Sequence, residues 1–140
     1  MFRKSIALTG LLILCLAHSL VGRPLAASNL PDLKILQYEF VSTNDKLVRV
    51  QIANIGKAAS RPCQLELAVR KIKGVGATRN AVETIPAIEA GGEEWVTIST
   101  SGILQSAISL KEDTTFRLRV DENNVVVEAR EDNNEMWHNE

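Results

Sequence analysis

Three segments of this chain alternate apolar and polar residues with a period of two, and this pattern restricts the fold more than any other feature. They cover residues 46–54, 63–70 and 114–121. Successive side chains of a strand point to opposite faces, so the pattern predicts antiparallel strands with one face on a core and the other in solvent. The residues expected to point inward are Val48, Val50, Ile52, Cys63, Leu65, Leu67, Val69, Phe116, Leu118 and Val120.

Weaker segments bring the total to about seven strands. We expect further strands at residues 32–40, 81–85, 94–99 and 125–128, the last with a short continuation towards Trp137. Turn-forming residues separate the segments, including a flexible loop at 73–76 and a tight glycine turn at 89–92. About seven short strands at this spacing predict an all-β, antiparallel two-sheet sandwich. Residues 101–110 lack the alternation, and we interpret them as a crossover between the sheets with one or two helical turns.

The first residues are typical of an export signal. A basic start at Arg3 and Lys4 precedes an uncharged apolar run over residues 6–21, and small residues follow. We therefore expect a signal peptide at 1–27 and a single domain at 28–140, exported to the periplasm, the cell surface or the extracellular space. An uncleaved N-terminal anchor is the alternative. We do not expect the remaining domain to insert into a membrane.

Charge and cysteine content exclude several functions for that domain. The chain has 16 basic and 17 acidic residues, and three of the basic ones, Arg3, Lys4 and Arg23, lie in the predicted signal. The rest is therefore net acidic, which argues against a nucleic-acid-binding module. Outside the signal the only cysteine is Cys63, so no intramolecular disulfide is expected, and its place in a strand favours a buried thiol.

No pattern in the sequence indicates catalysis. His138 is the only histidine beyond the predicted signal, and it is far in sequence from Cys63. Neighbouring carboxylates such as Glu93 and Glu94 would point to opposite faces of a strand, so they would not converge as a general acid and base. We therefore predict no catalytic residues and no cofactor-binding residues, and a protein that is not an enzyme.

The acidic, amide-rich segment 121–134 supports two hypotheses. Oxygen ligands suit calcium, and the candidate ligands are Asp121, Glu128, Glu131 and Asn133, although their spacing is not that of an EF-hand. The alternative is structural: Asp and Asn side chains cap backbone groups at turns, and Glu128 bonds to a neighbouring strand or pairs with Arg117 or Arg119. The sequence favours the structural hypothesis, and calcium is the only cofactor that it suggests.

The sequence Asn54-Ile55-Gly56 predicts a turn after a strand, in which Asn54 tethers the turn and Gly56 adopts a left-handed conformation. Trp95 should lie on an outer face, either exposed for a sugar or protein contact or half covered by a loop. Trp137 should cover the open end of the core. Arg49, Arg117 and Arg119 should lie on a solvated sheet face and pair with Glu66.

Four motifs, in their order along the chain, resemble the pattern of a known family. They are Pro31-Asp32-Leu33, the Asn54-Ile55-Gly56 turn, the connection Ile85-Pro86 to Gly91, and a C-terminal pattern of Asp121, Asn124, Val126, Glu128, Glu131, Asn133 and Asn134. Together, over residues 31–134, they resemble CARDB, the cell-adhesion-related domain found in bacteria. The segment 101–110 is longer than the family pattern leads us to expect.

The resemblance implies a seven-stranded immunoglobulin-like sandwich in which Asn54, Gly56, Asn124 and Asn134 are structural. It also implies an exported, non-catalytic adhesion or interaction module that binds a protein or a cell-surface polymer. A calcium-dependent carbohydrate-binding or enzyme-accessory module is the alternative. Nothing in the sequence assigns an oligomeric state.

Overall fold

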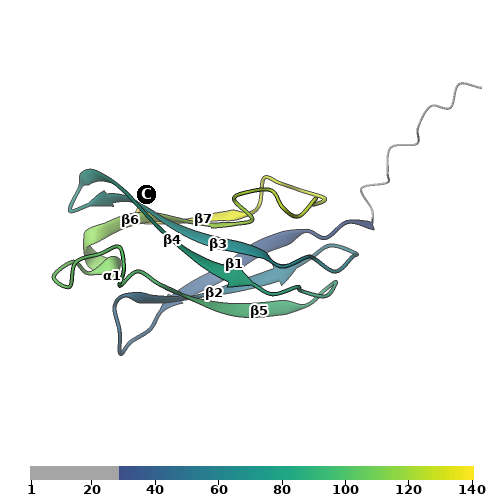
Figure 1. Cartoon of the computed structure of the whole chain (residues 1–140), viewed down its shortest axis with the longest axis horizontal. Helices are drawn as coiled ribbons and strands as arrows, with labels where there is room; N and C mark the ends of the chain where they lie inside the picture. The colour runs from purple at the N-terminus through teal and green to yellow at the C-terminus, as the bar shows by residue number, and fades with distance from the viewer. Residues whose placement is uncertain (1–28) are drawn as a thin grey trace, which may run out of the picture.

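The computed structural model describes residues 29–140 and confirms the predicted all-β sandwich of seven strands (Figure 1). Two antiparallel sheets pack face to face. The three-stranded sheet has the order β1-β2-β5, formed by Leu33–Phe40, Leu47–Asn54 and Glu93–Ser99. The four-stranded sheet has the order β4-β3-β6-β7, formed by Val75–Ile85, Cys63–Ile72, Thr114–Val120 and Glu135–His138. The predicted signal at 1–27 lies outside the described residues.

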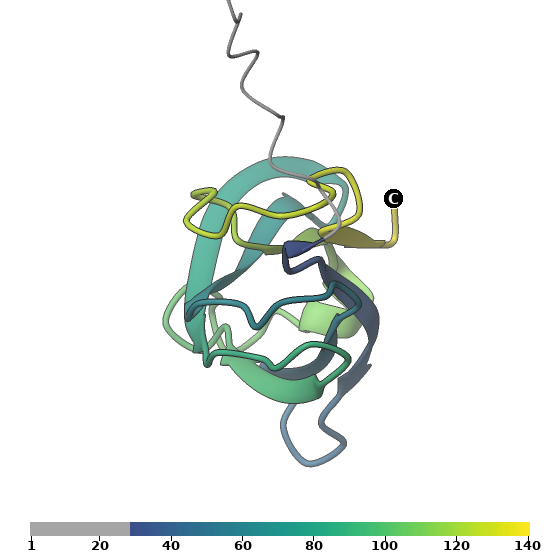
Figure 2. The ribbon, with the colours of Figure 1, turned by 90° about the vertical axis from the view of Figure 1, so that its right-hand side faces the viewer.

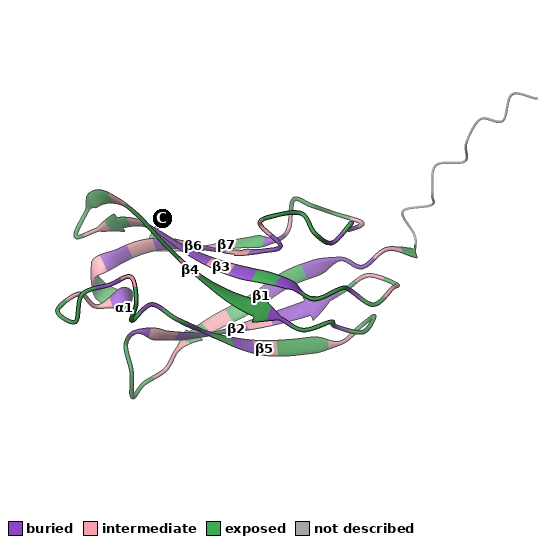
Figure 3. Cartoon of the chain, viewed as in Figure 1, coloured by how far each residue is buried: buried purple, intermediate pink, exposed green. Residues whose placement is uncertain are grey.

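The alternating residues form the core between the sheets. All ten side chains predicted to point inward are buried, and they meet in register: Leu67 of β3 lies opposite Leu118 of β6. In the other sheet Val50 of β2 lies opposite Val96 of β5. Each fully buried aliphatic side chain contributes about 1.5–3 kcal/mol relative to exposure, so this face provides most of the driving force for folding. Figure 3 shows buried and exposed residues alternating along the strands of both sheets.

The crossover between the sheets follows β5. Residues 101–109 form turns, and Leu104 covers one end of the core, as the sequence predicted. The helical turn is displaced from its predicted position: α1 covers only Leu110–Asp113. Ser109 caps α1, because its hydroxyl accepts a hydrogen bond from the backbone N–H of Glu112 at 3.2 Å.

The hairpin between β3 and β4 is tighter than predicted. Lys73 and Gly74 alone form the turn, with φ values of 49° and 77°. Positive φ at both central residues suits a two-residue hairpin turn, because its twist matches that of the strands. The expected loop at 73–76 is therefore wrong, and β4 begins at Val75 rather than at residue 81.

The predicted strand at 125–128 is also wrong. β6 ends where Asp121 adopts a positive φ of 53°, and irregular structure continues to Asn134 before β7. Burial alternates along this segment, since Val126 and Glu128 are buried while Val125 and Val127 are exposed. The backbone donors, however, bond to side chains and to the segment preceding β1 instead of to a sheet partner.

β7 closes the sandwich with different side chains from those expected. His138 lies opposite Phe116 and stacks on it with ring centroids 4.8 Å apart, and Met136 also packs on the core. Trp137 lies opposite Arg117, which places it on the outer face, so the prediction that Trp137 covers the core is wrong. None of the helices formed by residues 29–140 has the length and apolar character needed to cross a membrane.

Candidate functional site

The irregular segment 121–134, here called the C-terminal loop, lies at one end of the sandwich beside the start of β1. Figure 1 shows it in yellow at the end where residue 29 enters the domain, and Figure 2 looks onto this end. Backbone hydrogen bonds fix both its ends and its middle. Asp121 N donates to Gln64 O at 2.8 Å, Val120 N to Asn134 O at 2.9 Å, and Ala129 N to Pro31 O at 2.8 Å.

Asp121 organises the first half of the C-terminal loop. Its side chain is buried, and its two carboxylate oxygens accept hydrogen bonds from the N–H groups of Val125 at 2.9 Å and Val126 at 2.8 Å. Asn124, also at positive φ, donates its N–H to the Asp121 carbonyl at 2.8 Å. Asp and Asn tolerate this backbone conformation better than other side chains do, which explains both residue types.

Glu128 joins the second half of the loop to the first strand. Its Oε2 accepts a hydrogen bond from the Leu33 N–H, and its Oε1 accepts one from Asn134 Nδ2 at 2.9 Å. Burial raises the pKa of the Glu128 carboxyl to about 7, because the charged form loses hydration; the two hydrogen bonds oppose this rise, and nearby Glu131 adds to it. This is the strand contact that the structural hypothesis anticipated.

The other residues of the predicted calcium set are likewise engaged in local contacts. Glu131 Oε1 accepts a hydrogen bond from the Glu128 N–H at 3.2 Å. Asn133 Nδ2 donates to the carboxylate of the buried Asp32 at 2.8 Å. The side-chain oxygens of Asn133 and Asn134 are buried without a hydrogen-bond donor.

In this arrangement the carboxylates of Asp121 and Glu128 are held by N–H donors, which face both oxygens of each group. A calcium site needs six to eight oxygen ligands that converge on one point. Within residues 29–140, no three His, Cys, Asp or Glu side chains are grouped so that they could hold a metal ion.

Asn54 anchors the neighbouring turn. Its side chain is fully buried, and Oδ1 accepts hydrogen bonds from the N–H groups of Asp32 at 3.0 Å and Gly56 at 3.1 Å. Its Nδ2 donates to the carbonyls of Ala58 at 2.8 Å and Ile88 at 2.9 Å. The Asn54 side chain therefore links the start of β1 to the β2–β3 connection, which contains Ala58, and to the β4–β5 connection, which contains Ile88.

Gly56 is required for a different reason from the one predicted. Its φ is not positive, so the left-handed conformation expected from the sequence is wrong. A Cβ atom there would lie 2.4 Å from Leu30 O and 2.5 Å from Asp32 N, so only glycine leaves room for the chain entering β1.

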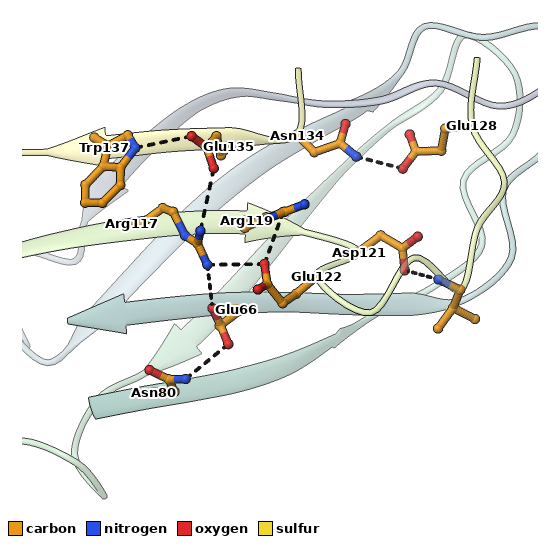
Figure 4. A network of polar contacts seen from close by, with 11 residues as sticks. Glu66, Asn80, Arg117, Arg119, Asp121, Glu122, Glu128, Asn134, Glu135 and Trp137 are labelled. Atoms are coloured by element: carbon orange, nitrogen blue, oxygen red, sulfur yellow. Dashed lines mark hydrogen bonds and ion pairs between the residues drawn. The ribbon is translucent and has the colours of Figure 1, made fainter. Parts of the chain in front are cut away.

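Charged residues on the outer face of the four-stranded sheet form a network (Figure 4). Arg117 Nη2 lies 3.2 Å from Glu66 Oε1 and 3.2 Å from Glu122 Oε2, and Arg119 Nε lies 3.1 Å from the same Glu122 oxygen. The predicted pairing of Arg117 with Glu66 is present. Arg49 belongs to the other sheet, where it pairs with Glu39 at 2.8 Å and stacks on Trp95, its Cζ atom 4.7 Å from the ring centroid.

Apolar side chains on the C-terminal loop face solvent. The prediction of a strand at 125–128 did not anticipate this exposure. Val125 and Val127 are 56% and 71% exposed. Together with Val126 they line a shallow cavity of ≈ 230 Å³ whose other residues are Pro31, Ala59 and Arg61. Buried contacts of the same loop hold these exposed valines in place.

Comparisons with known proteins agree with this fold. The family model of CARDB matches residues 30–137, so the chain belongs to the CARDB family. None of the curated proteins compared with the chain matches it.

Two solved structures are similar to this one. The first is the CARDB domain of a Pyrococcus furiosus protein in complex with di-metal ions; it is 20% identical, with a TM-score of 0.52, and the match covers 79% of this chain and 91% of that one. The second is a domain of a Methanosarcina acetivorans protein presumed to lie at the cell surface. It is 21% identical, with a TM-score of 0.55, and the match covers 78% of this chain and 89% of that one. At these identities the likeness establishes the shared fold.

Proposed function

We propose that this protein is an exported, non-catalytic interaction module that binds a protein or a cell-surface polymer at the loop end of the sandwich. The observation that carries the proposal is the pair of exposed valines, Val125 and Val127, on a loop held in place by buried carboxylates. Apolar side chains grouped beside a cavity are typical of interaction sites. A pre-ordered loop also loses less conformational entropy on binding, which favours affinity.

The chemistry of the remaining reactive groups supports a non-catalytic function. Burial raises the pKa of the Cys63 thiol to about 12, so almost no nucleophilic thiolate is present at neutral pH. His138 is held in the core edge, with Nδ1 2.8 Å from the Tyr38 hydroxyl and Nε2 2.8 Å from the Lys111 carbonyl. Both groups contribute to packing.

Export is supported by the basic and apolar start of the sequence and by the CARDB membership of the domain that follows. The proposed location is the periplasm, the cell surface or the extracellular space, and the partner is a protein or polymer found there.

A binding comparison between two valines tests the proposed surface. Val127 and Val75 are 71% and 70% exposed, but Val75 lies at the opposite end of the sandwich, beside the β3–β4 turn. We expect Val127→Asp to reduce capture of envelope proteins or polymers by the purified protein at least tenfold, and Val75→Asp to leave it unchanged. Equal capture by both variants and the wild type, or no capture by folded wild-type protein, would contradict the proposal.

Calcium-dependent binding, as in a carbohydrate-binding or enzyme-accessory module, is the second candidate. Two observations favour it. The buried side-chain oxygens of Asn133 and Asn134 accept no hydrogen bond, and the Pyrococcus furiosus domain was solved in complex with metal ions. A cation here would have to displace N–H donors from Glu128 or Asp121. A ligand of the folded state raises the melting temperature by mass action, so melting with calcium and then with chelator decides between the candidates. We expect no change in the midpoint; a rise with calcium that chelator reverses would establish the second candidate.

A further inference from the structure

The strand β4 is a long free edge of the four-stranded sheet. It pairs with β3 on one side only, and every residue except Ile85 is exposed or half-buried. A shift of register in the β3 pairing, between Val69 and Lys71, leaves residues 79–85 as the regular part of this edge. An unpaired edge offers backbone N–H and C=O groups to another strand, so proteins usually protect it.

Two opposite charges stand on the same face of this edge. In the β3 register Arg79 lies opposite Val69 and Glu83 opposite Leu65, so the two side chains are four residues apart on the core-facing side of the sheet, at its rim. Neither forms an ion pair with any other described residue. The Glu83 carboxylate accepts only the N–H of the adjacent Thr84, at 3.0 Å.

We propose that β4 pairs antiparallel with β4 of a second copy of this chain, in the register centred on Ala81. In that register Arg79 of each copy lies directly opposite Glu83 of the other, so both charges that lack partners in one copy are neutralised across the new pair. The two four-stranded sheets become one continuous sheet. This pairing goes beyond the proposed function and does not depend on it, because β4 contributes no residue to the valine-lined cavity.

The symmetry of the edge favours a second copy over an unrelated strand. Charged side chains on the core-facing side of an edge repel most incoming strands, and only a strand with the opposite charges at the matching positions relieves this. A shift of the register by one residue places Arg79 opposite an uncharged Val82 and leaves both charges without partners. The residue on the two-fold axis, Ala81, is small enough for close approach.

The pairing is expected to be weak by itself. An edge-to-edge contact of a few residues lies at the low end of protein interface areas, so we expect a dissociation constant of roughly micromolar order or weaker. Such pairing becomes effective where many copies are held close together, because the effective concentration is then high.

Charge reversal tests the register. Sedimentation velocity on the purified protein, expressed from the full chain, should show a monomer–dimer equilibrium from micromolar to millimolar concentration. We expect Arg79→Glu or Glu83→Arg alone to raise the dissociation constant about tenfold or more, because each places like charges opposite each other twice. The double variant exchanges the charges and should restore the wild-type value, while Lys34→Glu, at an exposed position of β1 in the other sheet, should have no effect.

A cysteine trap gives an independent measurement. Residues directly opposite on paired strands have Cα atoms about 4.5–5.5 Å apart, within the range of a disulfide. Ala81→Cys should therefore form disulfide-linked dimers on mild oxidation, whereas Val82→Cys, whose counterpart is displaced along the strand, should form far fewer. A strictly monomeric wild type, failure of the double variant to restore pairing, or equal cross-linking of both cysteine variants would overturn the proposal.

Discussion

At the scale of single residues, burial and hydrogen bonding have opposite effects on the pKa of Glu128. Its carboxylate accepts hydrogen bonds from Leu33 N and Asn134 Nδ2, but its burial raises the pKa to about 7 from the ordinary 4.5. Because the folded state holds the proton more tightly than the unfolded chain does, stability from this group is complete below pH 4.5 and is lost as the pH rises through 7. The pKa difference corresponds to at most about 3 kcal/mol.

We therefore predict that Glu128→Gln weakens the pH dependence of the unfolding free energy between pH 4.5 and 7. Relative to wild type, the variant should gain stability as the pH rises through this window, by up to about 3 kcal/mol. Its new amide can donate to the unpaired oxygen of Asn134 if that side chain turns over. Urea denaturation across this pH range measures the effect.

The alanine variant separates charge from hydrogen bonding. Glu128→Ala leaves the Leu33 N–H buried without an acceptor, which should cost about 1–3 kcal/mol at every pH. Equal pH slopes for wild type and the Gln variant would show that Glu128 does not titrate in this window.

Gly56 gives a second prediction at the residue scale. Gly56→Ala should destabilise the fold by roughly 1–3 kcal/mol, because its Cβ would meet the backbone at Leu30 and Asp32. Gly76→Ala in β4 is the matched control, since a Cβ there meets nothing within 4 Å. Denaturation midpoints of the two variants measure the difference, and equal midpoints would contradict the close-approach explanation.

At the scale of elements, the C-terminal loop takes the place of the strand predicted at 125–128. Its order depends on Asp121, whose two oxygens cap the N–H groups of Val125 and Val126. A carboxylate serves this position better than an amide, because an amide has only one acceptor oxygen.

We predict that Asp121→Asn lowers the unfolding free energy by about 1.5–3 kcal/mol, the usual contribution of a charge-assisted hydrogen bond. Hydrogen exchange at the amides of Val125 and Val126 should accelerate more than exchange in β6. Asp132→Asn, in the same loop but highly exposed, is the control and should leave both measurements unchanged. Uniform acceleration over all strands would mean that the loop and the sheets unfold as one unit.

At the scale of the whole molecule, the two sheets are joined along one side by β1 and β7. The Tyr38 hydroxyl lies 2.8 Å from His138 Nδ1, and both rings belong to an aromatic cluster with Phe40 and Phe116. In the tautomer whose Nε2–H donates to the Lys111 carbonyl, Nδ1 is the acceptor for the Tyr38 hydroxyl.

A double-mutant cycle with Tyr38→Phe and His138→Phe should therefore yield a coupling free energy of about 1 kcal/mol. The aromatic rings are retained, so the cycle isolates the hydrogen bond between the sheets. Equilibrium urea denaturation of the four proteins measures it, and additive effects of the two substitutions would show that this contact does not link the sheets.

Residue alternation predicted much of the fold because it records which side of a strand meets the core. The inward faces of β2, β3 and β6 were correct for this reason, as was the outward position of Trp95. The strand predicted at 125–128 does not form, although consecutive valines favour strands, because the backbone there bonds to side chains and to the segment before β1. His138 packs on the core, whereas Trp137, which we expected there, lies on the outer face. Their positions depend on the register of β7 with β6, and a strand of four residues is too short for the sequence pattern to specify that register.

The sequence by itself determined the fold class, the core face of the main strands and the family pattern, because these depend on local period and on the order of motifs. Only the tertiary structure decided how the ends meet. Glu128 bonds to Leu33 and Asn133 to Asp32 across 95 and 101 residues of chain, and Gly56 makes room for the segment before β1. Such contacts depend on the closure of the sandwich, which brings distant residues together in positions that no local pattern specifies.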